Sequence, residues 1–182
     1  MAMMNASDVV ELLGWLEQHG IAVWLNGGWG VDALLGHQTR AHRDLDITIS
    51  AADRAAYAAA MEAAGFGTYR VDNDFNWVLR DGRGRLVDAH LVDFSETLIS
   101  ATGVSVYGPA GLPFELGSLE GRGRIADKPV KCETAAFQVR GHTKYTPDEM
   151  DYQDVLALCR AFDIEIPAIF KQPGFDRPDP TM

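Results

Sequence analysis

Cysteine, basic charge and long apolar runs are all scarce in this 182-residue sequence. Only Cys132 and Cys159 are present, without a Cys-x-x-Cys pair, which argues against a disulfide scaffold and a zinc ribbon. Lys and Arg number 16 against 26 Asp and Glu, so the net charge of −10 is opposite in sign to that of a nucleic-acid binder. No run approaches the ~18 apolar residues of a membrane span, and the N-terminus lacks the basic region of an export signal. We therefore expect a cytoplasmic protein with a small neutral or cationic partner and no nucleic-acid or membrane partner.

The N-terminal half shows the spacings of both helices and strands. Ser7 is expected to cap the first helix and Gly20 to end it. Residues 44–49 alternate between polar and apolar side chains, which predicts a strand. The predicted elements are helices over 7–20, 29–35 and 53–64, strands over 21–25 and 44–49, and a tight turn over 26–28.

The second half is less regular. Two strands around 76–79 and 85–91 are predicted to form a hairpin through the Asp-Gly-Arg-Gly turn at 81–84. Glycine and proline are frequent between 95 and 132, which predicts irregular strands and loops, whereas 134–140 and 147–162 are predicted to be helical. The predicted division is a catalytic domain over 1–132, a helical C-terminal subdomain over 133–172 and a tail over 173–182.

Three glycines lie where an apolar strand gives way to a helix. Gly28-x-Gly30-x-x-Ala33 fits a short dinucleotide fingerprint, in which glycines let the backbone approach a pyrophosphate. A dinucleotide fold places its acidic residue at the end of the second strand, whereas Asp44 and Asp46 come at the start of theirs. A turn that binds a triphosphate at Gly27 and Gly28 is the better interpretation.

Asp44 and Asp46 are two residues apart on a strand, so both carboxylates point to the same face. Two unpaired carboxylates so placed repel each other unless a cation holds them, and their oxygens suit Mg²⁺. Asp88 lies on a second strand, between apolar residues that face the other way. If the two strands are neighbours, three carboxylates meet at a site for two metal ions, which suits nucleotidyl transfer.

These residues resemble the antibiotic nucleotidyltransferases of the polymerase-beta-like superfamily, in particular the lincosamide and aminoglycoside nucleotidyltransferases. The resemblance rests on Trp-Leu-Asn-Gly-Gly-Trp-Gly-Val-Asp (24–32), His-Arg-Asp-Leu-Asp-Ile (42–47) and Leu-Val-Asp-Ala-His (86–90), and more weakly on 141–155. It implies the polymerase-beta-like fold, an α/β (α+β) arrangement of a small mixed sheet flanked by helices with a short helical C-terminal portion. The chain departs from the wider superfamily in having Gly-Gly where Gly-Ser is common, and in a longer interval before the first acid.

The resemblance implies transfer of a nucleoside monophosphate from ATP or another NTP to a hydroxyl of a small molecule, with release of pyrophosphate. By this resemblance Asp44, Asp46 and Asp88 bind two Mg²⁺ ions, and Asp88 can also accept the proton of the attacking hydroxyl. Gly27 and Gly28 bring backbone N–H groups to the triphosphate. The acceptor implied is an antibiotic of lincosamide or aminoglycoside type. The sequence does not decide whether the protein forms a homodimer.

Two arginines and a histidine flank the acids. Arg40 and Arg43 can clamp triphosphate oxygens, or instead pair with Asp44, Asp46 or helix carbonyls. His42 can order the loop before the acids from behind the ligands, or be purely structural. Trp29 can stack on a base or acceptor ring, but a core position is favoured.

Further candidates lie outside this segment. His90 shares the face of Asp88 and is expected to support the ligands from behind. His142 is expected in the same supporting role, and Lys144 to reach nucleotide phosphate from the C-terminal part. The remaining acids are expected to be mainly solvated surface; they are Asp72, Asp74, Asp148, Glu149 and Asp151.

Three rival functions stay open. One is a catalytically silent nucleotide-binding or regulatory protein of the same fold, against which the presence of all three carboxylates argues. Another is a nucleotidyltransferase with a protein or RNA acceptor, although the acidic charge disfavours RNA. A dinucleotide oxidoreductase is the most distant.

Overall fold

The computed structural model describes residues 3–109 and 113–171, and the tail predicted over 173–182 lies outside this part. The helices are α1 Ala6–Gln18, α2 Gly27–Leu35, α3 Arg54–Ala63, α4 Ala135–Gly141 and α5 Glu149–Phe162, with short 3-10 turns at Ala51–Asp53 and Ala168–Phe170. The strands are β1 Val23–Leu25, β2 Asp44–Ser50, β3 Phe66–Asn73, β4 Asn76–Asp81, β5 Leu86–Ile99, β6 Ser105–Gly108, β7 Gly121–Ile125 and β8 Lys128–Cys132. No helix of this part is long and apolar enough to cross a bilayer.

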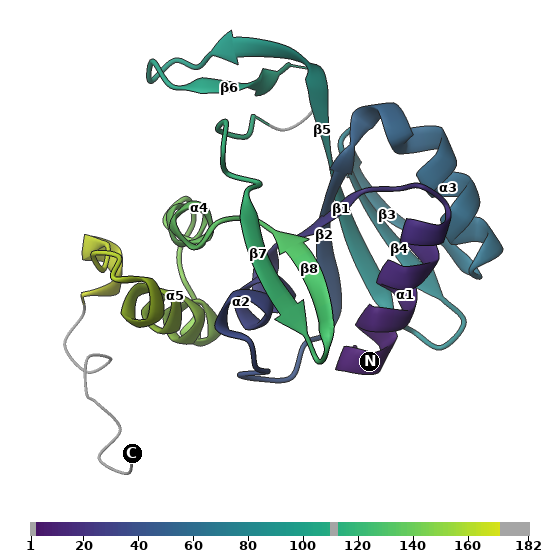
Figure 1. Cartoon of the computed structure of the whole chain (residues 1–182), viewed down its shortest axis with the longest axis horizontal. Coiled ribbons are helices and arrows are strands. Elements are labelled where there is room, and N and C mark those ends of the chain that lie inside the picture. The colour runs from purple at the N-terminus through teal and green to yellow at the C-terminus, as the bar shows by residue number, and fades with distance from the viewer. Residues whose placement is uncertain (1–2, 110–112, 172–182) are drawn as a thin grey trace.

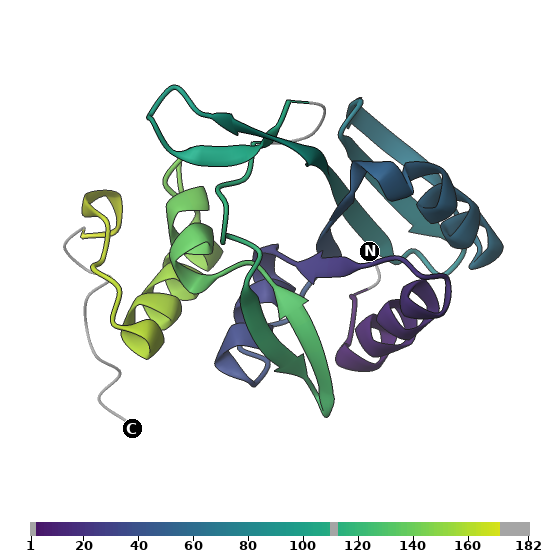
Figure 2. The same cartoon turned by 45° about the horizontal axis from the view of Figure 1, so that its top comes forward.

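The strands form one mixed sheet, as predicted, in the order β3-β4-β5-β2-β1-β8-β7 (Figure 1). The pairs β2–β5 and β1–β8 are parallel and the other neighbours along this path are antiparallel. The outer half of β5 leaves the sheet and pairs with β6, and this hairpin projects beyond it (Figures 1 and 2). The centre of the sheet is therefore built from strands that are far apart in the sequence.

One face of the central strands is apolar because their side chains alternate. Leu45, Ile47 and Ile49 of β2 are fully buried and join one core cluster with the apolar residues of β5, α1 and α3. Helices α1 and α3 lie on the same side of the molecule (Figure 1). The alternate residues of β2 and β5, which include the predicted acids, are thereby left to the opposite face.

The C-terminal helices form a second cluster against α2. Tyr152, Val155 and Leu158 of α5 pack with Val139 of α4 and Val31 of α2. Both cysteines are buried as free thiols, one in each cluster. Helix α2 is consequently held between the sheet and the C-terminal helices, which fixes the position of its N-terminus.

The structure corrects several sequence predictions. The first helix is capped by Asn5 rather than Ser7, because the Asn5 side chain accepts from the backbone N–H of Asp8 in a reciprocal capping box. Helix α2 begins at Gly27, two residues earlier than predicted. The 76–81 and 86–99 hairpin is confirmed, but β3 was not predicted, and 95–132 contains a regular β7–β8 hairpin.

Candidate active site

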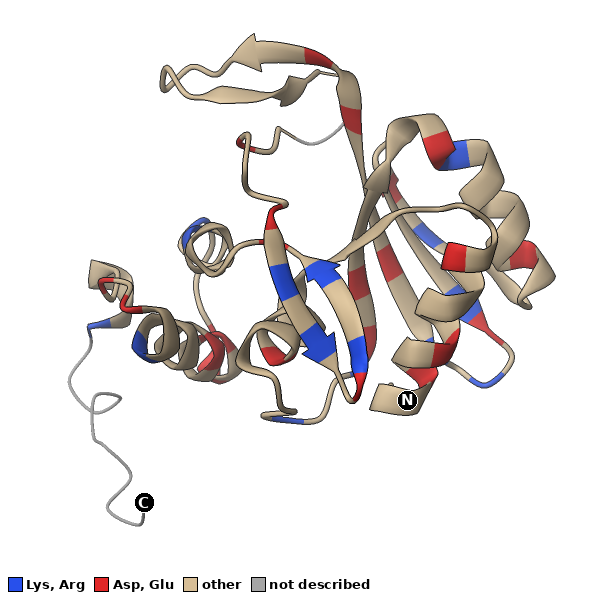
Figure 3. Ribbon diagram, viewed as in Figure 1, with Lys and Arg blue, Asp and Glu red and all other residues tan. Residues whose placement is uncertain are grey.

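Parallel pairing of β2 with β5 places Asp46 directly opposite Asp88. Asp44 lies two residues before Asp46 on the same face, opposite Leu86. One ligand atom each from Asp46, Asp88 and His90 lies within 4.8 Å of the others, which makes a possible metal-binding group. His90, expected behind the ligands, therefore lies among them, while Asp44 is outside this group. Figure 3 shows acidic segments on neighbouring strands at the centre of the sheet.

This group carries unbalanced negative charge. Burial, reinforced by the carboxylates of Asp44 and Asp88, raises the pKa of Asp46 well above its usual value. Burial and Asp88 likewise raise the pKa of Asp44, and burial lowers that of His90. Arg70 lies 3.8 Å from Asp88, and the side-chain amide of Asn76 donates to the Asp88 carboxylate. The oxygen-rich donor set fits a hard divalent cation such as Mg²⁺, which would remove this repulsion.

The glycine turn lies against these acids. Gly27 has a φ of +53°, and a Cβ atom there would collide with the carboxylate of Asp46. A Cβ atom at Gly28 would collide with the side chains of His42 and Arg40. A left-handed residue that leads into a right-handed helix directs successive N–H groups into one concavity, which binds anions. Gly30 has a packing role, since its Cβ would lie 3.1 Å from the Leu25 carbonyl oxygen.

Arg40 is paired, but with a residue outside the alternatives the sequence suggested. Its guanidinium donates to both carboxylate oxygens of Asp154 on α5, at 3.2 and 2.7 Å, and to Nδ1 of His42 at 3.0 Å. Since an arginine can only donate, Nδ1 is an acceptor and Nε2 of His42 donates to the buried carboxylate of Asp32. These contacts order the loop before β2, as proposed for His42.

Trp29 belongs to the core. Its side chain is 1% exposed and its ring centroid lies 4.5 Å from that of His42. Stacking on a nucleotide base is therefore excluded for this side chain in the present arrangement. Arg43 is exposed and is not among the residues that line the cleft described next.

A cleft of about 530 Å³ opens over the glycine turn, Asp46 and His90, within the usual range of ligand sites. Asp46, His90, Gly27 and Gly28 line one side, and α4, α5 and the segment between them line the other. The second side contributes His142, Lys144 and Phe137, which shares an aromatic pair with Phe114. His142 is anchored by the carbonyl oxygen of Gln138 at 2.8 Å. The predicted approach of Lys144 from the C-terminal part is therefore geometrically available.

Two buried acids of the site were missed. Asp154 and Glu133 both line the cleft and are 2% and 6% exposed. Glu133 follows β8 and accepts from the side-chain amide of Asn26 at 3.3 Å. Burial raises the pKa of Glu133 to about 7, against the hydrogen bonds from Asn26 and Thr48. No sequence pattern marked Glu133, which follows the stretch predicted as irregular strands and loops, whereas Asp154 lies in the 141–155 stretch that carries the weaker part of the resemblance. Asp72, Asp74 and Glu149 are exposed, as expected. Asp148 and Asp151 form the capping box of α5, and Asp151, which was expected to be solvated surface, also lines the cleft.

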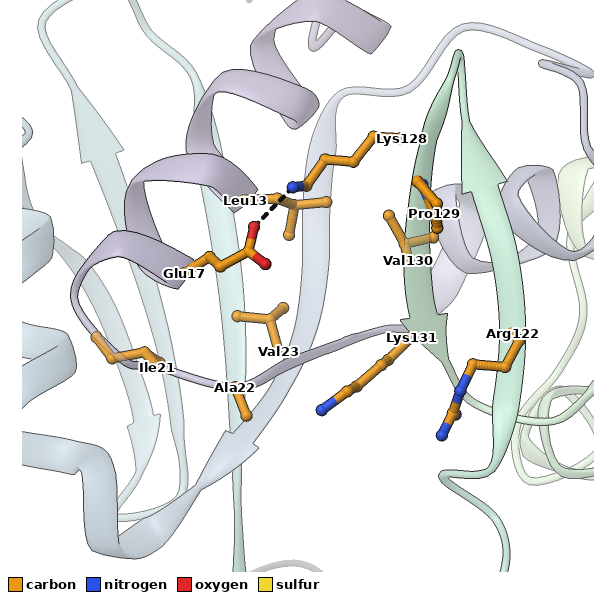
Figure 4. A pocket seen from close by; sticks show the side chains of 10 residues that line it. All are labelled: Leu13, Glu17, Ile21, Ala22, Val23, Arg122, Lys128, Pro129, Val130 and Lys131. Atoms are coloured by element: carbon orange, nitrogen blue, oxygen red, sulfur yellow. Dashed lines mark hydrogen bonds and ion pairs between the residues drawn. The ribbon is translucent and has the colours of Figure 1, made fainter.

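A second hollow lies between α1 and the β7–β8 hairpin (Figure 4). Lys128, Lys131 and Arg122 line it, and Lys128 binds Glu17 at 2.8 Å. The hairpin carries the basic stripe seen in Figure 3. None of the carboxylates of the β2–β5 group borders this hollow, so the candidate chemistry belongs to the first cleft.

Comparison with known proteins agrees with this geometry. The sequence profile of the aminoglycoside-2''-adenylyltransferase family matches residues 8–158. The chain belongs to this family. It is 25% identical to a lincosamide resistance protein of Staphylococcus haemolyticus over 161 residues, covering 85% of this chain and 94% of that protein. It is 27% identical to a 2''-aminoglycoside nucleotidyltransferase of Klebsiella pneumoniae over 124 residues, covering 68% of this chain and 64% of that protein.

Solved structures show the same fold. The lincosamide adenylyltransferase LnuA bound to lincomycin superposes with a TM-score of 0.72 at 22% identity, covering 86% of this chain and 98% of that one. ANT(2'')-Ia in complex with adenylyl-2''-tobramycin gives 0.69 at 21% identity, covering 86% and 88%. The predicted polymerase-beta-like fold of the antibiotic nucleotidyltransferases is therefore confirmed. Membership of the adenylyltransferase family makes the protein a nucleotidyltransferase, as the sequence predicted.

Proposed function

We propose that this family member transfers a nucleoside monophosphate, with ATP as the first candidate donor, to a hydroxyl of an antibiotic in the cytoplasm. The acceptor classes are those of its relatives: the compared proteins are a lincosamide resistance protein and aminoglycoside nucleotidyltransferases. The proposal is carried by one observation: the left-handed glycine turn shares one cleft with Asp46 and His90, and the ligand atoms of these two residues lie within 4.8 Å of that of Asp88.

The residues have distinct roles in this proposal. The N–H groups of Gly27 and Gly28 bind the triphosphate, and Lys144 approaches it from the opposite wall of the cleft. Asp44, Asp46 and Asp88 would hold two Mg²⁺ ions, with His90 close enough to contribute. Bound Mg²⁺ would stabilise the negative charge that develops on the transferred group and on pyrophosphate. Arg40 is occupied by Asp154 and orders the loop, so we assign it a structural role rather than a triphosphate clamp.

The transfer itself is an in-line displacement. The acceptor hydroxyl oxygen forms a bond to the α-phosphorus as the bond from that phosphorus to the bridging oxygen of pyrophosphate breaks. We assign Asp88 as the acceptor of the hydroxyl proton, because Asn76 and His90 hold its carboxylate and its ligand atom lies within 4.8 Å of those of Asp46 and His90, which line the cleft. Positioning and electrostatic stabilisation supply most of the rate.

The test is a direct assay. Purified protein with Mg²⁺, ATP labelled at the α-phosphate and a panel of lincosamides and aminoglycosides should transfer label to one acceptor class and release pyrophosphate. Asp88→Asn should lower the rate at least about 100-fold. Asp127→Asn is the matched control, since Asp127 is fully exposed in the β7–β8 turn and should retain the wild-type rate. Absence of label transfer to every acceptor with any of the four common NTPs would reject the proposal.

A further inference from the structure

Asn26 stands at the N-cap position of α2 but does not cap the helix. Its backbone is extended, with φ of −134° and ψ of −168°, as is usual for an N-cap residue, yet its side chain makes no capping hydrogen bond. Asn5, the other asparagine at an N-cap, accepts from the first turn of α1 at 2.9 Å in the ordinary way. Asparagine is among the best N-cap residues, so other contacts must hold the Asn26 side chain away from the first turn of α2.

The cause is visible in the contacts of its amide group. Nδ2 of Asn26 donates to Oγ1 of Thr48 at 3.0 Å and to Oε1 of Glu133 at 3.3 Å. These two bonds use both amide hydrogens and fix the plane of the amide. The remaining atom, Oδ1, is buried without a hydrogen-bond partner among the described residues, and the side chain as a whole is 7% exposed. An orphaned buried acceptor beside free N–H groups is costly unless a function requires it.

The free N–H groups are those of the first turn of α2. A helix leaves its first N–H groups without acceptors inside the helix, and at α2 no side-chain cap supplies one. The same turn borders the cleft and faces the Asp46 group. A side-chain oxygen placed on these donors would compete directly with a phosphate oxygen.

We propose that Glu133 is a positioning residue of the nucleotide subsite: with Thr48 it holds the Asn26 side chain away from the first turn of α2 and leaves those N–H groups to the triphosphate. This inference rests on the proposed function for the identity of the ligand. It also explains why a carboxylate 6% exposed stands at the end of β8, where it has no arginine or lysine within salt-bridge distance in the described part of the chain.

The position of Glu133 is set by the fold. Leu25 and Cys132 are paired across the parallel β1–β8 contact, and the N–H of Glu133 donates to the Leu25 carbonyl oxygen at 2.9 Å. The residue after β1 and the residue after β8 are therefore side by side. Thr48 reaches the same point because β2 is the other neighbour of β1. The ends of β1 and β8 and the interior residue Thr48 of β2 thus converge on one amide group.

The experiment compares five proteins: wild type, Glu133→Ala, Glu133→Gln, Asn26→Ala and the Asn26→Ala/Glu133→Ala double variant. The probes are calorimetric titration with a non-hydrolysable ATP analogue and Mg²⁺, and amide hydrogen exchange of Gly28 and Trp29 by NMR without nucleotide. In Glu133→Ala the released Asn26 side chain should cap the turn, so both amides should become protected and nucleotide affinity should fall about tenfold. Glu133→Gln keeps an acceptor oxygen and should stay within about twofold of wild type.

The double variant separates this role from direct contact with the ligand. If Glu133 acts through Asn26, adding Glu133→Ala to Asn26→Ala should change affinity by less than about twofold. An equal loss in both backgrounds would show that Glu133 touches the ligand itself and would overturn the proposal. Unprotected amides together with unchanged affinity in Glu133→Ala would also overturn it. Thr48→Val offers an independent release of Asn26 should Glu133→Ala fail to fold, and it should likewise protect the amides.

The two proposals can fail separately. If wild-type protein binds no nucleotide, the proposed function fails, whereas the exchange of Gly28 and Trp29 still shows whether Glu133 controls Asn26. If nucleotide binds but the exchange and the double variant show no link between Glu133 and Asn26, the positioning role alone fails.

Discussion

Glu133→Gln should stabilise the protein at alkaline pH and leave it unchanged near pH 4.5. Burial raises the pKa of Glu133 from 4.5 to about 7 in the folded state. Between these values the folded protein keeps a proton that the unfolded chain loses, so folding becomes less favourable as pH rises through this window. Raising the pKa from 4.5 to about 7 corresponds to about 3 kcal/mol, since each pKa unit is worth 1.36 kcal/mol. Glutamine has no proton to lose and avoids this penalty.

The measurement is urea unfolding of both proteins, followed by tryptophan fluorescence in EDTA, at half-unit steps from pH 4.5 to pH 8. The difference in unfolding free energy should grow from zero to about 3 kcal/mol in favour of Glu133→Gln. Asp44 and Asp46 also have raised pKa values, so both proteins should lose stability as the pH rises; the difference reports on Glu133 together with its contribution to the raised pKa of Asp46. Glu62→Gln, on the exposed face of α3, is the matched control and should give a flat difference. A flat difference for Glu133→Gln as well would refute the reasoning.

Three further substitutions address other parts of the site. Mg²⁺ at about 100 times its Kd should stabilise the wild type by about 2.7 kcal/mol in thermal melting and should have little effect on Asp46→Asn; equal stabilisation of both would place the ion elsewhere. Arg40→Ala should cost about 3 kcal/mol in urea unfolding because it leaves the Asp154 carboxylate, 3% exposed, without its partner; a cost below about 1 kcal/mol would contradict a buried pair. Gly27→Ala should destabilise the fold by about 1–3 kcal/mol and abolish nucleotide binding in calorimetry. Gly14→Ala, in open space within α1, should instead be slightly stabilising.

The carboxylate group could be predicted from sequence because it depends on local periodicity. Asp44 and Asp46 share a face since side chains alternate along a strand, and the flanking apolar residues of Asp88 indicate its face in the same way. The parallel pairing of β2 with β5 then aligns the two patterns. The hairpin through 81–84 and the helix before Gly36 were equally local. The first residue of α2 was harder to predict, because Gly27 has a positive φ and the pattern of side chains does not reveal backbone angles.

The partners of the buried polar groups could not be predicted, because they depend on which distant elements the fold brings together. Arg40 meets Asp154, 114 residues away, only because α5 packs against α2. Arg40 forms an ion pair, as one of the two interpretations predicted, but its partner is Asp154 rather than Asp44 or Asp46. Strand β3 was missed for a similar reason: seven of its eight residues are exposed, so it lacks the alternation that marks a half-buried strand.

At Glu133, local sequence patterns and contacts between distant elements both contribute to the site. Its neighbours Asn26 and Thr48 lie in segments that sequence patterns located, yet their contact with Glu133 follows from the order β2-β1-β8, in which β8 joins the sheet after a crossover. A residue that stabilises the fold only through the alternation of polar and apolar side chains should tolerate any substitution that keeps this alternation. Glu133 occupies a position where an apolar residue would be cheaper to bury, so its carboxylate is best explained by what it does to Asn26. The glycine turn alone thus does not define the nucleotide subsite, since the donors are available only while a residue from the far strand keeps the N-cap side chain away.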